Sequence, residues 1–125
     1  PISIISSNAS LLTCPADRLR TRTESYVGFS NSNLSYFVSL DATPASGARA
    51  ASMILAGDRE LSLADQKVTT GLIVLTNFTT LGWKFGHSGR GVLAFGDGHS
   101  ETVLTKDLPA RFQRQAITTN RLVIP

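Results

Sequence analysis

The stretch Gly91-Val92-Leu93-Ala94-Phe95-Gly96-Asp97-Gly98-His99-Ser100-Glu101-Thr102-Val103-Leu104 contains the strongest local structural signal in the chain. Two strand-like runs flank an Asp-Gly pair, and such a pair favours a two-residue type I′ turn, which needs positive φ at both central residues. We therefore predict a β-hairpin with the turn at Asp97 and Gly98. In its register Gly96 faces His99, Phe95 faces Ser100, Leu93 faces Thr102 and Val92 faces Val103.

Other short runs of β-branched and aromatic residues are bounded by Gly, Asn, Asp and Ser, as is typical of strands. Trp83 and Phe85 alternate with Lys84, so both aromatic side chains are expected on one face, in the core. The pattern predicts one antiparallel sheet of short strands. They cover residues 35–40, 52–57, 71–75, 79–85, 91–96 and 99–104.

The ends of the chain carry different signals. Residues 6–33 are polar and contain Pro15, which predicts a loop with one short helical turn. Asp107 and Pro109 are typical of a helix start, with Asp107 as the N-cap. The helix is expected to bury Leu108, Phe112 and Ala116 and to end near residues 118–120, before a strand at 122–124. The predicted fold class is α+β.

Composition indicates a folded chain. Of its 125 residues, 42% are hydrophobic and 17% are charged, which is too apolar for a disordered chain. This length suits one domain over residues 1–125. The net charge of +3 comes without a basic run, so nucleic acid is not expected as a partner.

The compartment cannot be derived from cysteine usage, because Cys14 is the only cysteine. No stretch approaches the ~20 apolar residues that cross a bilayer, and no signal peptide opens the chain. The sequence starts at Pro1-Ile2-Ser3-Ile4-Ile5 in the middle of a pattern. We therefore expect a further N-terminal segment outside this sequence.

His87 is followed by nine residues and then Asp97-Gly98. This H-x9-D-G arrangement resembles the signature of a prepilin-type family related to type II secretion pseudopilins. Three further pieces resemble the family in the same order along the chain. They are Cys14-Pro15-Ala16-Asp17, Ser35-Tyr36-Phe37-Val38-Ser39-Leu40-Asp41 and Ile54-Leu55-Ala56-Gly57-Asp58-Arg59.

The resemblance implies a pilin-like head that packs against a hydrophobic N-terminal helix, and that helix is absent from this sequence. It further implies a structural subunit of a pseudopilus or type IV pilus-like filament, not an enzyme. The implied partners are other pseudopilin subunits, the secretion machinery and the prepilin peptidase that removes the leader. The implied location is the periplasmic cell envelope, with the full-length protein anchored in the inner membrane. Without the helix, dimerisation or residues 107–118 are expected to cover the exposed sheet face.

The motif residues have a structural interpretation that needs no chemistry. An extended run from Gly91 to Asp97 spans roughly 20 Å, so His87 reaches Asp97 only if the intervening residues double back. We expect His87 to hydrogen-bond a loop, and Asp97 and Gly98 to form the hairpin turn.

Metal binding is the alternative for several residues. His87 and His99 are candidate zinc ligands with an aspartate, and carboxylate oxygens are suited to calcium. No EF-hand spacing is present, so no cofactor is predicted, with calcium as the alternative. The candidate ligands are Asp41, Asp58, Asp65, His87 and His99. Asp58-Arg59 fits an ion pair equally well.

Two other functions remain open. A pilin-anchored module that binds carbohydrate or protein would show an exposed aromatic cluster formed by Tyr26, Phe29, Tyr36 and Phe37. A metal-dependent hydrolase would need His87, Asp97 and His99 to converge in a cleft.

Overall fold

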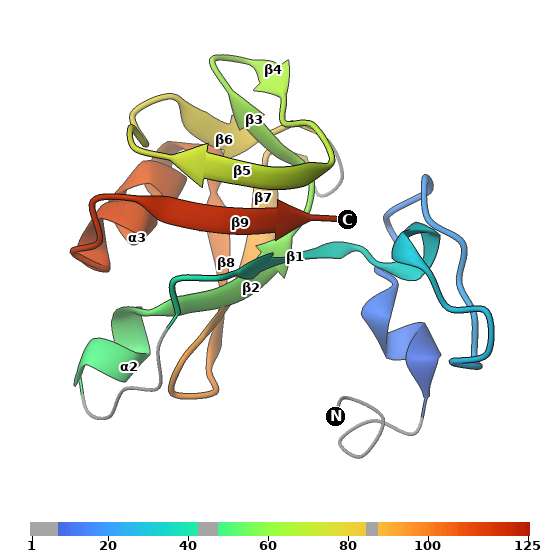
Figure 1. Ribbon diagram of the computed structural model, residues 1–125. Coiled ribbons are helices and arrows are strands. Elements are labelled where there is room, and N and C mark those ends of the chain that lie inside the picture. Colours follow the sequence, from blue (N-terminus) through green and yellow to red (C-terminus); the bar gives the residue numbers. More distant parts are fainter. Residues whose placement is uncertain (1–7, 43–47, 85–87) are drawn as a thin grey trace.

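The computed structural model describes residues 8–42, 48–84 and 88–125, and within them the strands form two antiparallel sheets (Figure 1). The larger sheet consists of β1 (Tyr36–Ser39), β2 (Ile54–Asp58), β5 (Gly71–Leu75), β7 (Arg90–Phe95), β8 (Ser100–Leu104) and β9 (Asn120–Ile124). The smaller sheet consists of β3 (Leu61–Leu63), β4 (Gln66–Lys67) and β6 (Leu81–Trp83). The helices are α2 (Ala48–Ser52), α3 (Leu108–Arg114) and the 3-10 helices η1 (Ala9–Leu12), η2 (Asn31–Asn33) and η3 (Thr105–Asp107).

The α+β class and the mostly antiparallel sheet are confirmed, but the expectation of a single sheet is wrong. The larger sheet has the order β5-β9-β1-β2-β7-β8, and β6 lies in the smaller sheet with the order β4-β3-β6. The sequence analysis missed β3 and β4, because strands of three and two residues show almost no alternation. The C-terminal strand is longer than expected and pairs on both sides, with β1 and with β5.

The hairpin of β7 and β8 is present, but its turn type and register differ from the prediction. The N–H of Gly98 donates to the carbonyl of Phe95 at 3.0 Å, and the N–H of Phe95 donates to the carbonyl of His99 at 2.9 Å. Gly98 has φ +91°, whereas Asp97 is not among the residues with positive φ. The loop therefore has three residues, a type I turn followed by a left-handed glycine.

This longer loop shifts the pairing by one residue. Gly91 faces Val103 and Leu93 faces Glu101, where the prediction paired Leu93 with Thr102. Cross-strand partners share a face, so the observed register keeps the exposed Val92 away from the buried Val103. The two-residue turn with positive φ occurs instead at Ala64 and Asp65, between β3 and β4.

The main core lies on one face of the larger sheet, where α3 covers it. Phe37, Leu93 and Leu122 of the sheet and Leu108 and Phe112 of the helix are all buried in one cluster. From the expected covering segment, residues 107–118, it is α3 that covers this face.

Trp83 belongs to the same core, as predicted, and its Nε1–H donates to the carbonyl of Val103 at 2.9 Å. Phe85, its expected companion, lies outside the described residues.

The helix α3 is shorter than predicted. It follows η3, has Pro109 in its first turn and ends at Arg114, and the Asp107 side chain makes no capping hydrogen bond. Ala116, expected on the buried face, is exposed with φ +56°. A left-handed residue directly after the C-cap Gln115 ends the helix. The buried side chain of Gln115 points into the core, where its Oε1 accepts from the N–H of Ile54 at 2.8 Å.

The other face of the larger sheet carries an apolar row in register across five strands. Leu72 faces Val123, Val123 faces Val38, Val38 faces Ala56, and Ala56 faces Ala94. Leu72 is 60% exposed, Val38 53% and Val123 40%. This row is called the open face below.

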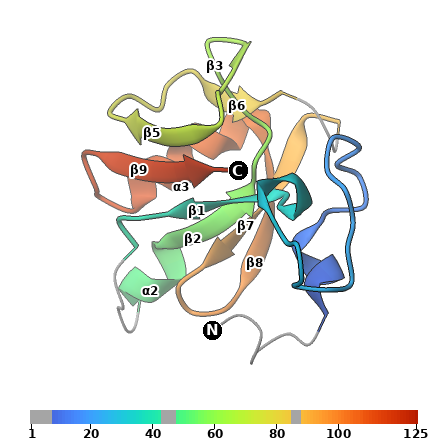
Figure 2. The same cartoon turned by 45° about the vertical axis from the view of Figure 1, so that its right-hand side comes forward.

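The N-terminal segment, residues 8–35, contains η1 and η2 and lies beside the sheet (Figures 1 and 2). The predicted loop with a short helical turn is confirmed for the part of 6–33 that the structure describes. The N–H of Ser35 donates to the carbonyl of Leu12, which closes the segment on itself. Arg20 donates to the carbonyls of Leu34 and Pro125, which connects the segment to the end of β9.

Candidate functional site

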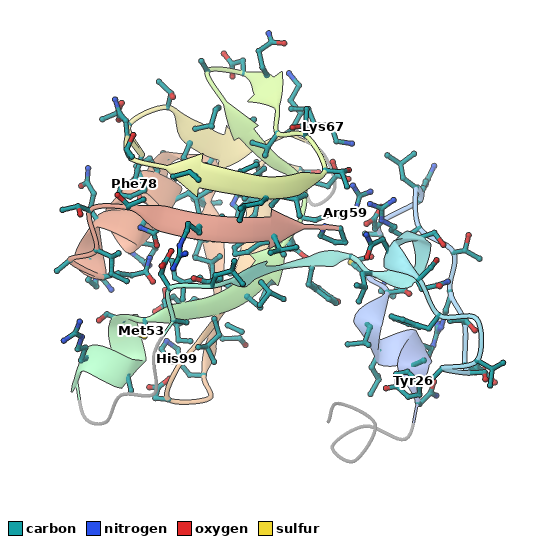
Figure 3. The ribbon with its side chains drawn as sticks, in the orientation of Figure 1. Tyr26, Met53, Arg59, Lys67, Phe78 and His99 are labelled. Carbon is teal, nitrogen blue, oxygen red and sulfur yellow. The ribbon has the colours of Figure 1, made fainter. Side chains whose placement is uncertain are left out.

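Two of the family-like sequence pieces meet in an ion pair between the N-terminal segment and the sheet. The Nε of Arg59 lies 2.7 Å from Oδ2 of Asp17, and its Nη2 lies 2.8 Å from Oδ1. These residues are 42 positions apart, and Arg59 follows β2 directly. Figure 3 shows Arg59 at the junction between the sheet and the N-terminal segment.

The ion pair extends into a small charge network. The Nη2 of Arg59 also lies 2.7 Å from Oε1 of Glu60, and the Nζ of Lys67 lies 3.5 Å from Oε2 of the same residue. The side chains of Arg59 and Asp17 are 4% and 7% exposed. The two parallel hydrogen bonds fix the orientation of the two side chains relative to each other. Because the pair is shielded from water, removing one partner would leave the other charge buried and unpaired, which is costly.

A cavity of about 600 Å³ adjoins this network. One wall is the loop from Cys14 to Leu19, and the opposite wall is formed by residues 58–60, Trp83 and Arg90. The three family-like pieces each contribute to it, the second through Ser35 at the start of β1. The cavity is therefore the place where segments distant in sequence form one concave surface.

The network sets the charge states around the cavity. Burial alone would raise the pKa of Asp17, but hydrogen bonds from Arg59 and the charge of that guanidinium hold the pKa below its usual value. Burial raises the pKa of Tyr36, and the negative charges of the nearby Asp58 and Asp17 add to the rise. Asp17 is thus ionised and Tyr36 neutral around neutral pH.

A second polar cluster lies on the hairpin of β7 and β8. Nδ1 of His99 contacts Oδ1 of Asp97, and Nε2 lies 3.3 Å from Oε1 of Glu101. Oε2 of Glu101 accepts from Nε of Arg111 on α3 at 2.7 Å. The His99 ring also stacks on Phe95, with the ring centroids 4.6 Å apart.

The hydrogen bonds of this cluster favour its charged forms. The hydrogen bond to Asp97 and then the one to Glu101 raise the pKa of His99. The bond to His99 lowers the pKa of Asp97, and the bond to Arg111 is the main cause of the lowered pKa of Glu101. The arrangement links the two strands of the hairpin and α3 through side-chain hydrogen bonds.

Two of the residues proposed as metal ligands, Asp41 and Asp58, have other partners. The Oδ1 of Asp41 lies 2.7 Å from Nη2 of Arg121. The Oδ2 of Asp58 accepts from the N–H of Val92 at 2.8 Å, and Arg59 pairs with Asp17 and Glu60. Asp65 lies in the exposed turn after β3.

Among the described residues no three His, Cys, Asp or Glu side chains are grouped to hold a metal ion. Asp97 and His99 do meet, but His87 lies outside the described residues, so neither the motif contact nor the proposed catalytic group is tested.

The aromatic cluster expected for a binding module does not form as one surface. Phe37 is fully buried in the core. Tyr26 and Phe29 contact each other with ring centroids 5.7 Å apart, and both are only partly exposed. Tyr36 lines a different surface, on the open face.

Comparison with known proteins adds no identification. No family model, curated protein or solved structure matches this chain. In the part of the chain that the structure describes, no helix is both long and apolar enough to span a bilayer.

Sequence reasoning missed most of the cavity. Asp17 was quoted only as part of a sequence piece, and Arg59 was assigned to its neighbour Asp58. Glu60 and Arg90 were not singled out at all. No local signal could have found them, because charged residues at strand ends are common and the pairing spans 42 positions.

Proposed function

We propose that this chain is the head of a structural subunit in a pilin-like filament, and that it acts by assembly and not by catalysis. The observation that carries the proposal is the open face, where apolar side chains are aligned across five strands. Isolated surface apolar residues need no explanation, but an aligned patch of this kind marks an interaction surface.

The dimensions of the open face suit a helix. Five strands at about 4.8 Å spacing span about 19 Å, and a helix with its side chains is about 10 to 12 Å wide. A groove of about 460 Å³ lies over β1, β2 and β7, and Leu12 and Leu34 of the N-terminal segment border it. One helix fits on this face beside the N-terminal segment.

In this proposal the helix is the hydrophobic N-terminal helix that the family resemblance implies. It anchors the full-length protein in the inner membrane, after the prepilin peptidase has removed the leader. Neighbouring subunits and the secretion machinery are then the partners, and the head lies in the periplasm. The order of the sequence pieces supports the proposal independently of the open face.

A cysteine-labelling experiment tests the proposal. Val38→Cys is made in a Cys14→Ser background, in the 125-residue chain and in the protein that includes the preceding segment of its gene. We expect maleimide to label residue 38 rapidly in the short chain and at least tenfold more slowly in the longer protein. Gln113→Cys on the exposed side of α3 is the control, with equal rates in both. Equal rates at residue 38 would show that no helix covers the open face.

A further inference from the structure

The cavity beside Arg59 has the size of a small-molecule site. Its volume of about 600 Å³ lies within the range of ligand pockets, about 300 to 1,000 Å³. It is built by rigid strands on one side and by the N-terminal segment on the other. Its properties do not depend on whether the chain assembles into a filament.

Every carboxylate that lines the cavity already has a partner. Both oxygens of Asp17 are bound by Arg59. Oε1 of Glu60 lies 2.7 Å from Nη2 of Arg59, whereas the buried Oε2 forms no hydrogen bond and is paired only by charge with Nζ of Lys67 at 3.5 Å. Asp58 accepts from the N–H of Val92. The negative charges in the wall are therefore engaged within the protein.

Two cations of the wall have no such partner. Arg18 on the loop and Arg90 at the start of β7 are both exposed. Among the described residues neither guanidinium group forms a hydrogen bond or an ion pair, unlike the neighbouring Arg59. Arginine presents a planar fork of donors that matches a carboxylate. The unmatched charge at the cavity is thus positive.

Apart from Ser35 and Cys14, the remaining lining is apolar. Leu19 is 66% exposed at the cavity, and Pro15 and Ala16 lie on the same loop. Trp83 lines the cavity with the small part of its ring that is exposed, since the residue is only 7% exposed and its Nε1–H donates to the carbonyl of Val103 in the interior. An apolar group beside the two arginines would contact these side chains and leave the core unchanged.

We propose that this cavity binds a small organic carboxylate that carries an apolar group. Arg90 and Arg18 bind the carboxylate, and the apolar group packs against Leu19 and the exposed part of Trp83. The bound group neutralises the only arginines of the wall that lack an acidic partner. The N-terminal segment supplies half of the site, so ligand binding also stabilises its contact with the sheet.

Trp83 provides a direct readout, because it is the only tryptophan in the chain. The probes are N-acetylleucine and N-acetylleucinamide, which share the apolar group and differ in charge. We expect saturable changes in Trp83 fluorescence and in its indole N–H signal in NMR with the acid, and at least tenfold weaker binding of the amide. Arg90→Gln should weaken binding of the acid by about tenfold, the loss of one charge-assisted contact. Arg114→Gln on α3 is the control, with unchanged affinity.

Three outcomes would overturn the proposal. Equal affinity for the acid and the amide would show that charge is not recognised. Inorganic phosphate binding as tightly as N-acetylleucine would show that the apolar wall contributes nothing. The absence of a saturable change in both signals would mean that the cavity is not a site. Because the Arg90 side chain is exposed, its variant should keep the circular dichroism spectrum of the parent, which separates lost binding from lost folding.

Discussion

Two single residues, both glycines, decide how closely aromatic rings approach the backbone of the larger sheet. A Cβ at Gly91 would lie 2.6 Å from Cε2 of Trp83, and a Cβ at Gly57 would lie 2.7 Å from Cε1 of Phe37. These glycines let two aromatic rings pack directly on the backbone of the larger sheet. His99 is another residue with several contacts: its ring stacks on Phe95 and forms hydrogen bonds with Asp97 and Glu101.

The pKa of His99 is expected to be above its ordinary value of about 6.5, because Asp97 and Glu101 stabilise the imidazolium. Asp97→Asn should lower this pKa toward 6.5. A group with a raised pKa contributes stability below its unfolded pKa, and this contribution is lost as the pH rises through the folded pKa. The free energy of unfolding of the parent should therefore exceed that of His99→Gln by more at mildly acidic pH than at alkaline pH.

NMR titration of the His99 ring signals and urea unfolding across that pH range measure both effects. Glu24→Gln, an exposed change in the N-terminal segment, should leave the His99 pKa in place. An unchanged pKa in Asp97→Asn would contradict the role given to that carboxylate.

Among the elements, α3 depends most on tertiary contacts. A helix of seven residues is too short to be stable alone. Its stability comes from the buried Leu108 and Phe112, and from Gln115 just beyond its end. Gln115 accepts from the N–H of Ile54 in β2 and donates from Nε2 to Oδ1 of Asn120 in β9 at 3.0 Å. One amide thus links the helix to two strands.

Gln115→Ala should destabilise the protein by about 1 to 3 kcal/mol, because it leaves the buried N–H of Ile54 without its acceptor. Gln113→Ala, on the exposed side of the same helix, should change stability by less than about 0.5 kcal/mol. Urea unfolding gives both values, and hydrogen exchange at the Ile54 amide should accelerate only in the first variant. If both substitutions lowered the free energy of unfolding equally, Gln115 would not link the helix to the strands.

For the whole molecule, the central question is how the N-terminal segment stays attached to the sheet. Few regular elements support it, since residues 8–35 contain only the two 3-10 helices η1 and η2 within the described chain. The attachment relies on polar contacts, above all Asp17 with Arg59 and Arg20 with the carbonyl of Pro125. Losing one contact should therefore loosen the segment before the sheet unfolds.

Asp17→Asn should cost about 1.5 to 3 kcal/mol, the range for a hydrogen bond to a charged group. It should also speed proteolysis within residues 18–29. Because the pKa of Asp17 is lowered in the folded state, its contribution is present above about pH 4 and is lost as the pH falls through the folded pKa. The difference in the free energy of unfolding between the parent and Asp17→Asn should therefore become smaller at acidic pH.

Limited proteolysis and urea unfolding at pH 7 and at pH 3 test this expectation. Asp107→Asn is the matched control, since the Asp107 side chain makes no capping bond. A proteolysis rate in Asp17→Asn equal to that of the control would mean that the ion pair does not hold the segment.

Local signals in the sequence were enough to predict the antiparallel β character, the hairpin around Asp97 and Gly98, and a short helix that buries Leu108 and Phe112. These features depend on interactions between near neighbours, such as side-chain alternation, turn residues and a proline in the first helical turn.

Other features depend on partners far along the chain and became visible only in the folded molecule. The register of the hairpin slipped by one residue, because the burial of Val103 against the sheet favours a three-residue loop over the two-residue turn. The bond between Gln115, at the end of the helix, and the distant Ile54 is another contact of this kind. The cavity formed because Arg59 pairs with a carboxylate 42 positions away, and no periodicity encodes which of several acids a buried arginine will meet.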